Sequence, residues 1–180
     1  MGQIKWFERK FDFDNTQNIF PSIVERLLGT ALRLEEKVKS IQDTIQDTGL
    51  IERVDYKWSI KENIGHLIDL EPLWQGRFED IKNGHTTLRP TDLQNNKTHL
   101  ANHNRKHIAE LLHEFSHIRR RTLDLIGHID EETIFKSALH PRLKTPMRVM
   151  DLFLFVAEHD DHHLARITEI TQNITPKSTD

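Results

Sequence analysis

Four long segments of the chain repeat apolar residues with the period of an α-helix, and this pattern constrains the fold more than any other feature. The predicted helices cover about residues 20–46, 60–82, 98–126 and 146–173. No stretch shows the sustained alternation or the Val, Thr and Tyr enrichment that is typical of a strand. Four amphipathic helices in 180 residues can bury all four stripes in one core. The sequence therefore predicts an all-α, four-helix bundle that forms a single domain over residues 1–180.

Local signals support the predicted helix boundaries. Ser59 and Glu62 have the spacing of a capping box, in which each side chain satisfies a free amide of the first turn. Pro21 suits a first helical turn, and Thr145-Pro146 predicts an N-cap followed by proline at the start of the last helix. Pro72 removes a backbone donor inside the second helix, so we expect a kink there.

Composition excludes several classes of function. A formal net charge of −3 gives no global reason to expect binding to nucleic acid. The chain has no cysteine, so it can offer neither a thiolate ligand nor a cysteine nucleophile, and this fits a reducing compartment. The longest apolar run, 152–157, is too short to span a membrane, and the N-terminus lacks the apolar core of a signal peptide. We therefore expect a soluble cytoplasmic protein that binds a small molecule.

Two predicted connections, at about 83–97 and 128–144, are longer than links in helical bundles usually are. They contain His85, Arg89, His140 and Arg142, which can approach a ligand if the loops shape a site. Of these, His140 and Arg142 are weak candidates for cofactor binding. The alternative is that both segments are solvated crossover loops with incidental charge.

The chain contains 12 histidines, and several are spaced by four residues. At about 100° per residue, His113 and His117 fall outside the apolar stripe of the third helix, so we expect both to face solvent. His99 is also outside the stripe and His103 lies at its margin. His107 points inward, where a single histidine is more often hydrogen-bonded to the protein than bound to a metal.

The last predicted helix places a histidine pair inside its apolar stripe. His159 and His163 lie about 40° apart on the helical wheel and both point into the bundle, whereas His162 falls at the rim. Two buried imidazoles lose hydration unless they gain partners, and one shared metal ion supplies a partner to both. For the third ligand, His66 is the best remaining histidine on another helix, but it sits off the main stripe, so from spacing alone it is equally well explained as a surface histidine.

The segments Trp58–Leu67 and Phe155–Ile167 together resemble motifs of the DinB/YfiT-like superfamily of metalloenzymes. The segment His140–Met147 is similar to the lead-in to the last helix of that family. With the order of the helices, the resemblance covers nearly the whole chain. It implies a four-helix bundle with two long crossover loops.

The resemblance also implies a metal site and a range of functions. Matched by position, His66, His159 and His163 become ligands of one divalent ion, with zinc or nickel favoured. Members of the family resemble thiol-dependent transferases or have been labelled hydrolases, and they are often homodimers. We therefore expect a metalloenzyme that activates an external low-molecular-weight thiol or a water. The alternatives are a non-catalytic metal-binding module, such as a stress-associated sensor, and a structural bundle without metal.

Charged residues near these histidines have candidate roles of their own. Asp160 and Glu62 are weak candidates for carboxylates that orient the metal-bound imidazoles. Glu158 and Asp161 point away from the core, so we expect them to face solvent. The run Arg119-Arg120-Arg121 can bind an anionic cofactor, but adjacent residues fan around a helix, which favours a solvated face.

Overall fold

The computed structural model describes residues 4–43, 47–54 and 57–174. None of the helices in these ranges is long and apolar enough to cross a membrane. The helical elements and strands, in chain order, are η1 (Trp6–Glu8), α1 (Phe20–Gln42), η2 (Asp47–Leu50), α2 (Ile60–Lys82), α3 (Asn96–Leu100), η3 (His103–Arg105), α4 (Ile108–Ile126), α5 (Glu131–Phe135), β1 (Ser137–Leu139), β2 (Pro146–Arg148) and α6 (Val149–Ile174).

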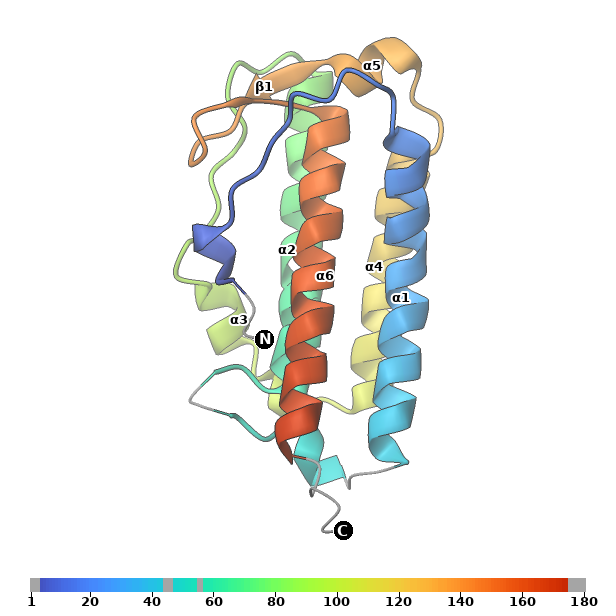
Figure 1. The fold of residues 1–180 in the computed structure, drawn as a ribbon, viewed down its shortest axis with the longest axis vertical. Coiled ribbons are helices and arrows are strands. Elements are labelled where there is room, and N and C mark those ends of the chain that lie inside the picture. The colour runs from blue at the N-terminus through green and yellow to red at the C-terminus, as the bar shows by residue number, and fades with distance from the viewer. Residues whose placement is uncertain (1–3, 44–46, 55–56, 175–180) are drawn as a thin grey trace.

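The helices α1, α2, α4 and α6 form the predicted four-helix bundle (Figure 1). Packing joins α1 to α4 and α6, and joins α2 to the same two helices. Helices α1 and α6 run downward in Figure 1, whereas α2 and α4 run upward. The consecutive helices α1 and α2 therefore lie on a diagonal of the bundle, and so do α4 and α6. Because α2 and α4 are parallel neighbours, the chain between them must return along the length of the bundle.

The prediction of one continuous helix over 98–126 is wrong, because part of this segment belongs to the returning connection. The segment is divided into α3, η3 and α4, and helix α4 begins only at Ile108. Asn95 and Asn102 have positive φ values of 54° and 52°. This left-handed conformation interrupts a right-handed helix, and asparagine is one of the few residues that adopt it readily. The apolar periodicity of the sequence continues through positions where the backbone turns, so periodicity alone did not reveal the break.

The last helix also begins later than predicted, because residues 146–148 form a strand. β2 pairs antiparallel with β1, so that Ala138 lies opposite Met147. The expectation that the chain contains no strand is wrong for this hairpin, since strands of three residues are too short to show alternation. Thr145-Pro146 is consequently not the N-cap of the last helix. The backbone of Leu88 bonds to that of Leu139, which fastens the α2–α4 connection to the hairpin.

The boundaries of the first two helices are closer to prediction. Helix α1 ends at Gln42, four residues before its predicted end, and residues 44–46 lie outside the described ranges. Helix α2 has the predicted bounds, and Ser59 and Glu62 form the complete capping box. The helix continues through Pro72 to Lys82.

A layer of buried polar side chains divides the core into two apolar clusters. On α6 the first cluster takes residues from 149–157 and the second from 164–170. The other long helices show the same division, with Thr30, Glu71 and Arg119 between the two sets of apolar residues. The candidate site lies in this layer, so apolar packing above and below positions it.

Candidate metal centre

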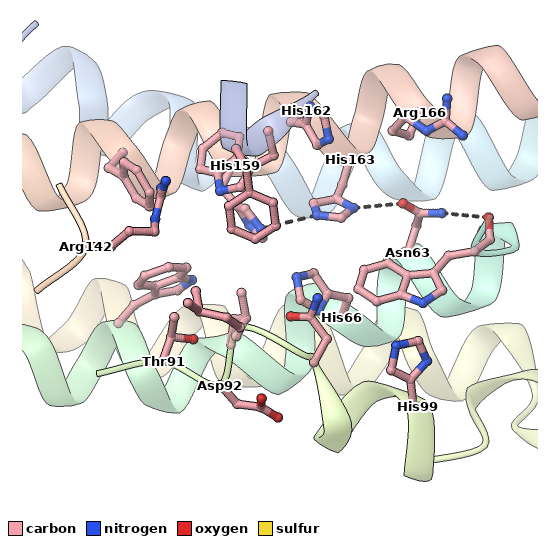
Figure 2. A pocket seen from close by; sticks show the side chains of 18 of the residues that line it. Asn63, His66, Thr91, Asp92, His99, Arg142, His159, His162, His163 and Arg166 are labelled. Carbon is pink, nitrogen blue, oxygen red and sulfur yellow. Dashed lines mark hydrogen bonds between the residues drawn. The ribbon is translucent and has the colours of Figure 1, made fainter. Parts of the chain in front are cut away.

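A pocket of about 400 Å³ opens between α2 and α6, and its lining explains the placement of the histidines. Residues spaced by three and four share one face of a helix, and each helix contributes such a row. The row on α2 is Asn63, His66, Leu70, Trp74 and Arg77. The row on α6 is Phe155, His159, His162, His163 and Arg166. Figure 2 shows the labelled members of both rows turned toward the same space.

His66, His159 and His163 meet at the centre of this pocket. Each offers a ring nitrogen that lies within 4.8 Å of those of the other two, and all three side chains are buried. The Nε2 atoms of His159 and His163 are 3.2 Å apart. Two nitrogens on a tetrahedral zinc-like ion are roughly 3.4 Å apart, because each bond is about 2.1 Å long. The spacing of this pair therefore suits a shared ion.

Asn63 sets which nitrogen of His163 carries the proton. The Asn63 amide nitrogen donates to the backbone carbonyls of Trp58 and Ser59, so its Oδ1 faces His163 as an acceptor. Nδ1 of His163, 2.8 Å away, must then be the donor. In the neutral ring this leaves a free lone pair on Nε2, the atom that faces His159 (Figure 2).

A chain of hydrogen bonds sets the same tautomer in His66. Thr98 donates its one hydroxyl hydrogen to Asp69 across 2.9 Å, so its oxygen can only accept from Nδ1 of His66, 3.0 Å away. The lone pair of the neutral His66 ring is thereby left on Nε2. Asp69 also contacts Nε2 of His103 at 2.8 Å. A side chain at Gly65 would collide with the His103 ring, so this glycine permits the contact.

His159 is packed among aromatic rings and contacts His163 through its Nε2. Its imidazole lies 4.9 Å from Trp6 and 5.8 Å from Trp74, measured between ring centroids. Its Nδ1 is buried and has no hydrogen-bond partner among the described residues. The protein thus leaves the polar atoms of this ring incompletely satisfied, which is unusual for a buried group.

Burial keeps all three imidazoles neutral, as a metal ligand must be. Burial lowers the pKa of His66 to about 4, with neighbouring histidines adding to the effect and Asp69 opposing it. Burial also places the pKa values of His159 and His163 well below the ordinary value. Three neutral imidazoles, two of them with the Nε2 lone pair fixed by hydrogen bonds at Nδ1, fit a divalent metal ion and leave coordination positions open toward the pocket.

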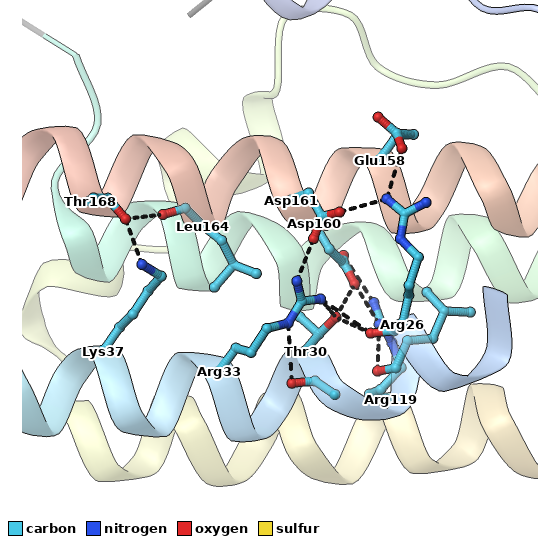
Figure 3. Close-up of polar contacts among 12 residues, drawn as sticks. Arg26, Thr30, Arg33, Lys37, Arg119, Glu158, Asp160, Asp161, Leu164 and Thr168 are labelled. Atoms are coloured by element: carbon cyan, nitrogen blue, oxygen red, sulfur yellow. Dashed lines mark hydrogen bonds and ion pairs between the residues drawn. The ribbon is translucent and has the colours of Figure 1, made fainter. Parts of the chain in front are cut away.

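The two carboxylates expected to orient these imidazoles have other partners. Asp160 accepts from Arg119 at 2.6 Å and from Thr30 at 2.8 Å, and Figure 3 shows this group between α1 and α6. Glu62 accepts from Arg53 and from the backbone of Ser59. The groups that bond to these imidazoles are instead Asn63, on the pocket face of α2, and Thr98 of α3, which is itself bound to Asp69 of α2.

The run of three arginines is divided between the core and the surface. Arg119 is buried, 2% exposed, and its guanidinium also donates to Glu71 at 2.8 Å. Arg120 and Arg121 are exposed. Although burial alone would lower it, the pKa of Arg119 is raised by Asp160 and Glu71. The expectation of a solvated face is therefore wrong for Arg119, because its long side chain reaches inward to two carboxylates.

Glu158 and Asp161 lie on the side of α6 away from the pocket but are not merely solvated. Glu158 pairs with Arg26 at 2.7 Å, and Asp161 pairs with Arg33 at 2.6 Å (Figure 3). Both carboxylates are half-buried and fasten α6 to α1. The helical wheel correctly predicted that both side chains point away from the pocket, but it could not predict their ion pairs with α1.

The remaining histidines are partly as predicted. His113 and His117 are exposed, as expected. His107 is wrong as a core residue, because it is the exposed N-cap of α4 and accepts from the backbone of Ala109. His103, assigned to a margin, is 2% exposed. His162 is half-buried at the rim, with its ring 5.6 Å from that of Trp6.

The loop candidates separate into two groups. His140 is buried, Arg142 is half-buried, and both line the pocket. His85 and Arg89 are exposed, and Arg89 forms an ion pair with Asp80 at 2.7 Å.

Comparisons with known proteins agree with this architecture. The structure is similar to that of YfiT from Bacillus subtilis, described as a probable metal-dependent hydrolase with an unusual four-helix bundle topology. The TM-score is 0.76 at 20% identity, over 93% of this chain and 94% of that chain. No curated protein matches the sequence. The model of the DinB superfamily matches residues 17–167. The chain therefore belongs to the DinB superfamily.

Proposed function

We propose that the protein is a metal-dependent enzyme in which His66, His159 and His163 hold one divalent ion beside a small-molecule pocket. The observation that carries the proposal is the fixed tautomer of two of these imidazoles, each with its lone pair turned inward. A bound divalent ion would supply Lewis acidity toward a water or a thiol that enters from the pocket. Hydrolysis is the proposed reaction, supported by the description of the structurally similar YfiT.

The chain itself supplies the binding and shielding around the histidines. Trp6, Trp58 and Trp74 line the pocket and cover the imidazoles with apolar surface. The Trp58 ring lies 4.5 Å from that of His66, and the Phe155 ring lies 4.9 Å from that of Trp6. Such walls bind an apolar substrate body and exclude bulk water from the reacting group.

Thiol transfer is the second candidate, and one observation keeps it open. The chain has no cysteine, so a nucleophilic thiol would have to come from outside, and the pocket is large enough to admit one. Both reactions use the same three histidines.

The metal proposal is tested on protein purified without a histidine tag. Elemental analysis should find close to one divalent ion per chain, and His159→Ala and His163→Ala should each remove it. The double variant His113→Ala/His117→Ala is a matched control, because this exposed pair has the same spacing on α4 and should leave the metal content unchanged. Full occupancy in both His159→Ala and His163→Ala would refute the site.

The reaction is tested with the metal-loaded protein. A panel of esters and amides should show hydrolysis that is lost in His66→Ala, abolished by a chelator and restored by zinc. A parallel panel of low-molecular-weight thiols with a fluorogenic electrophile tests transfer. Stoichiometric metal without turnover in either panel would instead favour a non-catalytic metal-binding module.

A further inference from the structure

A buried guanidinium without a counter-ion lines the pocket beyond the histidines. Arg77 is 1% exposed, and among the described residues no carboxylate forms an ion pair with it. Its Nε donates to the carbonyl of Arg89 at 3.1 Å, but its Nη2 has no hydrogen-bond partner in the described ranges. The nearby Asp80 is already bound by Arg89 through two side-chain hydrogen bonds. A buried charge ordinarily requires an ionic partner.

His140 does not supply that partner. Its Nδ1 accepts from the backbone N–H groups of Arg142 and Leu143, at 3.2 Å and 3.1 Å. In the neutral ring the proton is then on Nε2, which lies 3.0 Å from Nη1 of Arg77. Two N–H donors therefore lie side by side without an acceptor between them, and a ligand oxygen could accept from both.

Arg142 adds a second cation to this end of the pocket. It is half-buried, its guanidinium lies 5.2 Å from the ring centroid of Phe7, and no described carboxylate pairs with it. Burial, with Arg142 contributing, lowers the pKa of Arg77 to about 10. Burial, Arg77 and Arg142 lower the pKa of His140 to about 4. These groups destabilise one another's charged forms, as expected of a cationic site without its anion.

The other arginines of the pocket are different. Arg53 pairs with Glu62, and Arg166 pairs with Glu169. Their charges are already compensated by the protein. Among the arginines of the pocket, the two without a paired carboxylate, Arg77 and Arg142, thus lie on α2 and on the loop after β1.

We propose that Arg77 and Arg142, together with Nε2–H of His140, bind a carboxylate or phosphate group of the substrate. This inference rests on the proposed function for the reaction at the histidines. The binding of the anionic group at Arg77 and Arg142 does not depend on it. Roughly 16 Å of helix rise separates His66 from Arg77, eleven positions apart on α2. Leu70, Trp74 and Phe155 line the intervening space. The substrate class is therefore an elongated molecule with an apolar middle, an oxyanion at one end and the reacting bond at the other.

The test uses metal-free full-length protein and three probes of similar size: phenyl phosphate, 4-phenylbutyrate and neutral 4-phenylbutanol. Intrinsic fluorescence reports binding, because all three tryptophans of the chain line the pocket. At least one anion should bind about tenfold or more tightly than the alcohol, which is the range expected for hydrogen bonds to charged groups. The comparison of the two anions identifies which oxyanion the subsite prefers.

Two variants locate the subsite. Arg142→Gln should weaken binding of the preferred anion about tenfold, whereas Arg142→Lys should retain most of it. Arg77→Lys keeps the charge but loses the planar fork, and should also weaken binding if thermal unfolding shows that it is folded. Arg166→Gln is the matched control, since this arginine lines the same pocket but is paired with Glu169. The affinity of this variant for the anion should stay within about twofold of the wild type.

Equal affinity for the anions and the alcohol, or unchanged anion affinity in Arg142→Gln, would overturn the inference. The same titration in His159→Ala keeps the two proposals apart. Anion binding that persists there, while metal is lost, supports the subsite independently of the metal. Anion binding that disappears there places the anion at the histidines and refutes the subsite.

Discussion

Two buried polar clusters lie on different sides of α6, and they differ in whether the protein satisfies their hydrogen-bonding groups. In the ionic cluster, Arg119 bonds to both Glu71 and Asp160. In the pocket cluster, Nδ1 of His159 and Nη2 of Arg77 are buried without a hydrogen-bond partner among the described residues. His159 and Asp160 are adjacent in the chain but turn to different clusters, since neighbours on a helix point about 100° apart. The two clusters are equally buried, but the ionic cluster joins helices through satisfied charges, whereas the pocket cluster is the one proposed to bind a ligand.

The ionic cluster contains a residue from every long helix. Thr30 on α1, Glu71 on α2, Arg119 on α4 and Asp160 on α6 are joined by hydrogen bonds of 2.5–2.8 Å. Because His159 directly precedes Asp160, the ionic cluster also fixes the part of α6 that carries the candidate ligands. Disrupting one cluster should mainly affect stability, and disrupting the other should mainly affect binding.

The largest effect is expected from Arg119→Met. This change leaves Glu71 and Asp160 buried without a counter-charge, so the free energy of unfolding should fall by about 3–5 kcal/mol. Urea denaturation measures the loss. The control is Arg120→Met, which removes an exposed neighbour and should change stability by less than about 0.5 kcal/mol. Similar losses in the two variants would contradict the structural role of the ionic cluster.

A smaller effect is expected from pH, and it should originate in the pocket cluster. The pKa of His66 is about 4 in the folded protein, against about 6.5 in an unfolded chain. Between these values the unfolded state binds a proton that the folded state does not, so stability is present above pH 6.5 and is lost as the pH falls toward 4. From pH 7 to 5, His66 alone should account for about 2 kcal/mol of the loss.

Urea denaturation in the presence of a chelator measures this pH dependence without metal. The profile of His66→Gln should be flatter than that of the wild type by about the same 2 kcal/mol. Other buried histidines, such as His140, contribute in the same direction and remain in both proteins. Parallel profiles for the two proteins would show that His66 is not held neutral by the fold.

The smallest effect is expected from Asp69→Asn, which alters a group that supports a ligand without removing the ligand. Burial alone would raise the pKa of Asp69, but hydrogen bonds from His103 and Thr98 lower it, so the acceptor of the chain is a carboxylate. Its loss should weaken zinc affinity about tenfold, at the lower end of the range for groups that orient metal ligands. Competition with a chromogenic chelator measures the change.

Asp92→Asn provides the control, because Asp92 also lines the pocket but bonds to the backbone of Gln94 and Asn96. Zinc affinity should be the same in this variant and in the wild type. An unchanged affinity in Asp69→Asn would mean that Thr98 and Asp69 do not position His66.

Helical periodicity did not place the pocket-lining residues of α2, because they lie on a second buried face of that helix. The main apolar stripe of this helix faces the core, and His66 and Arg77 lie on the face toward α6. A helix that is buried on two sides has a weaker amphipathic pattern, so periodicity does not distinguish its pocket face from an exposed one. The spacing of Asn63, His66, Leu70, Trp74 and Arg77 was the available signal. On α6, where the stripe and the histidines coincide, the wheel was sufficient to place His159 and His163.

The sequence by itself determined the four long helices, the capping box at Ser59 and the inward direction of His159 and His163. These features are local, because they depend on helical period and on neighbours within one turn. Only the tertiary structure decided that α2 lies beside α6, that Asn102 breaks the third predicted helix, and that Asp69 supports His66 through Thr98. Those outcomes depend on which surfaces meet, and contacts between residues distant in the chain are not encoded in the period of any one helix.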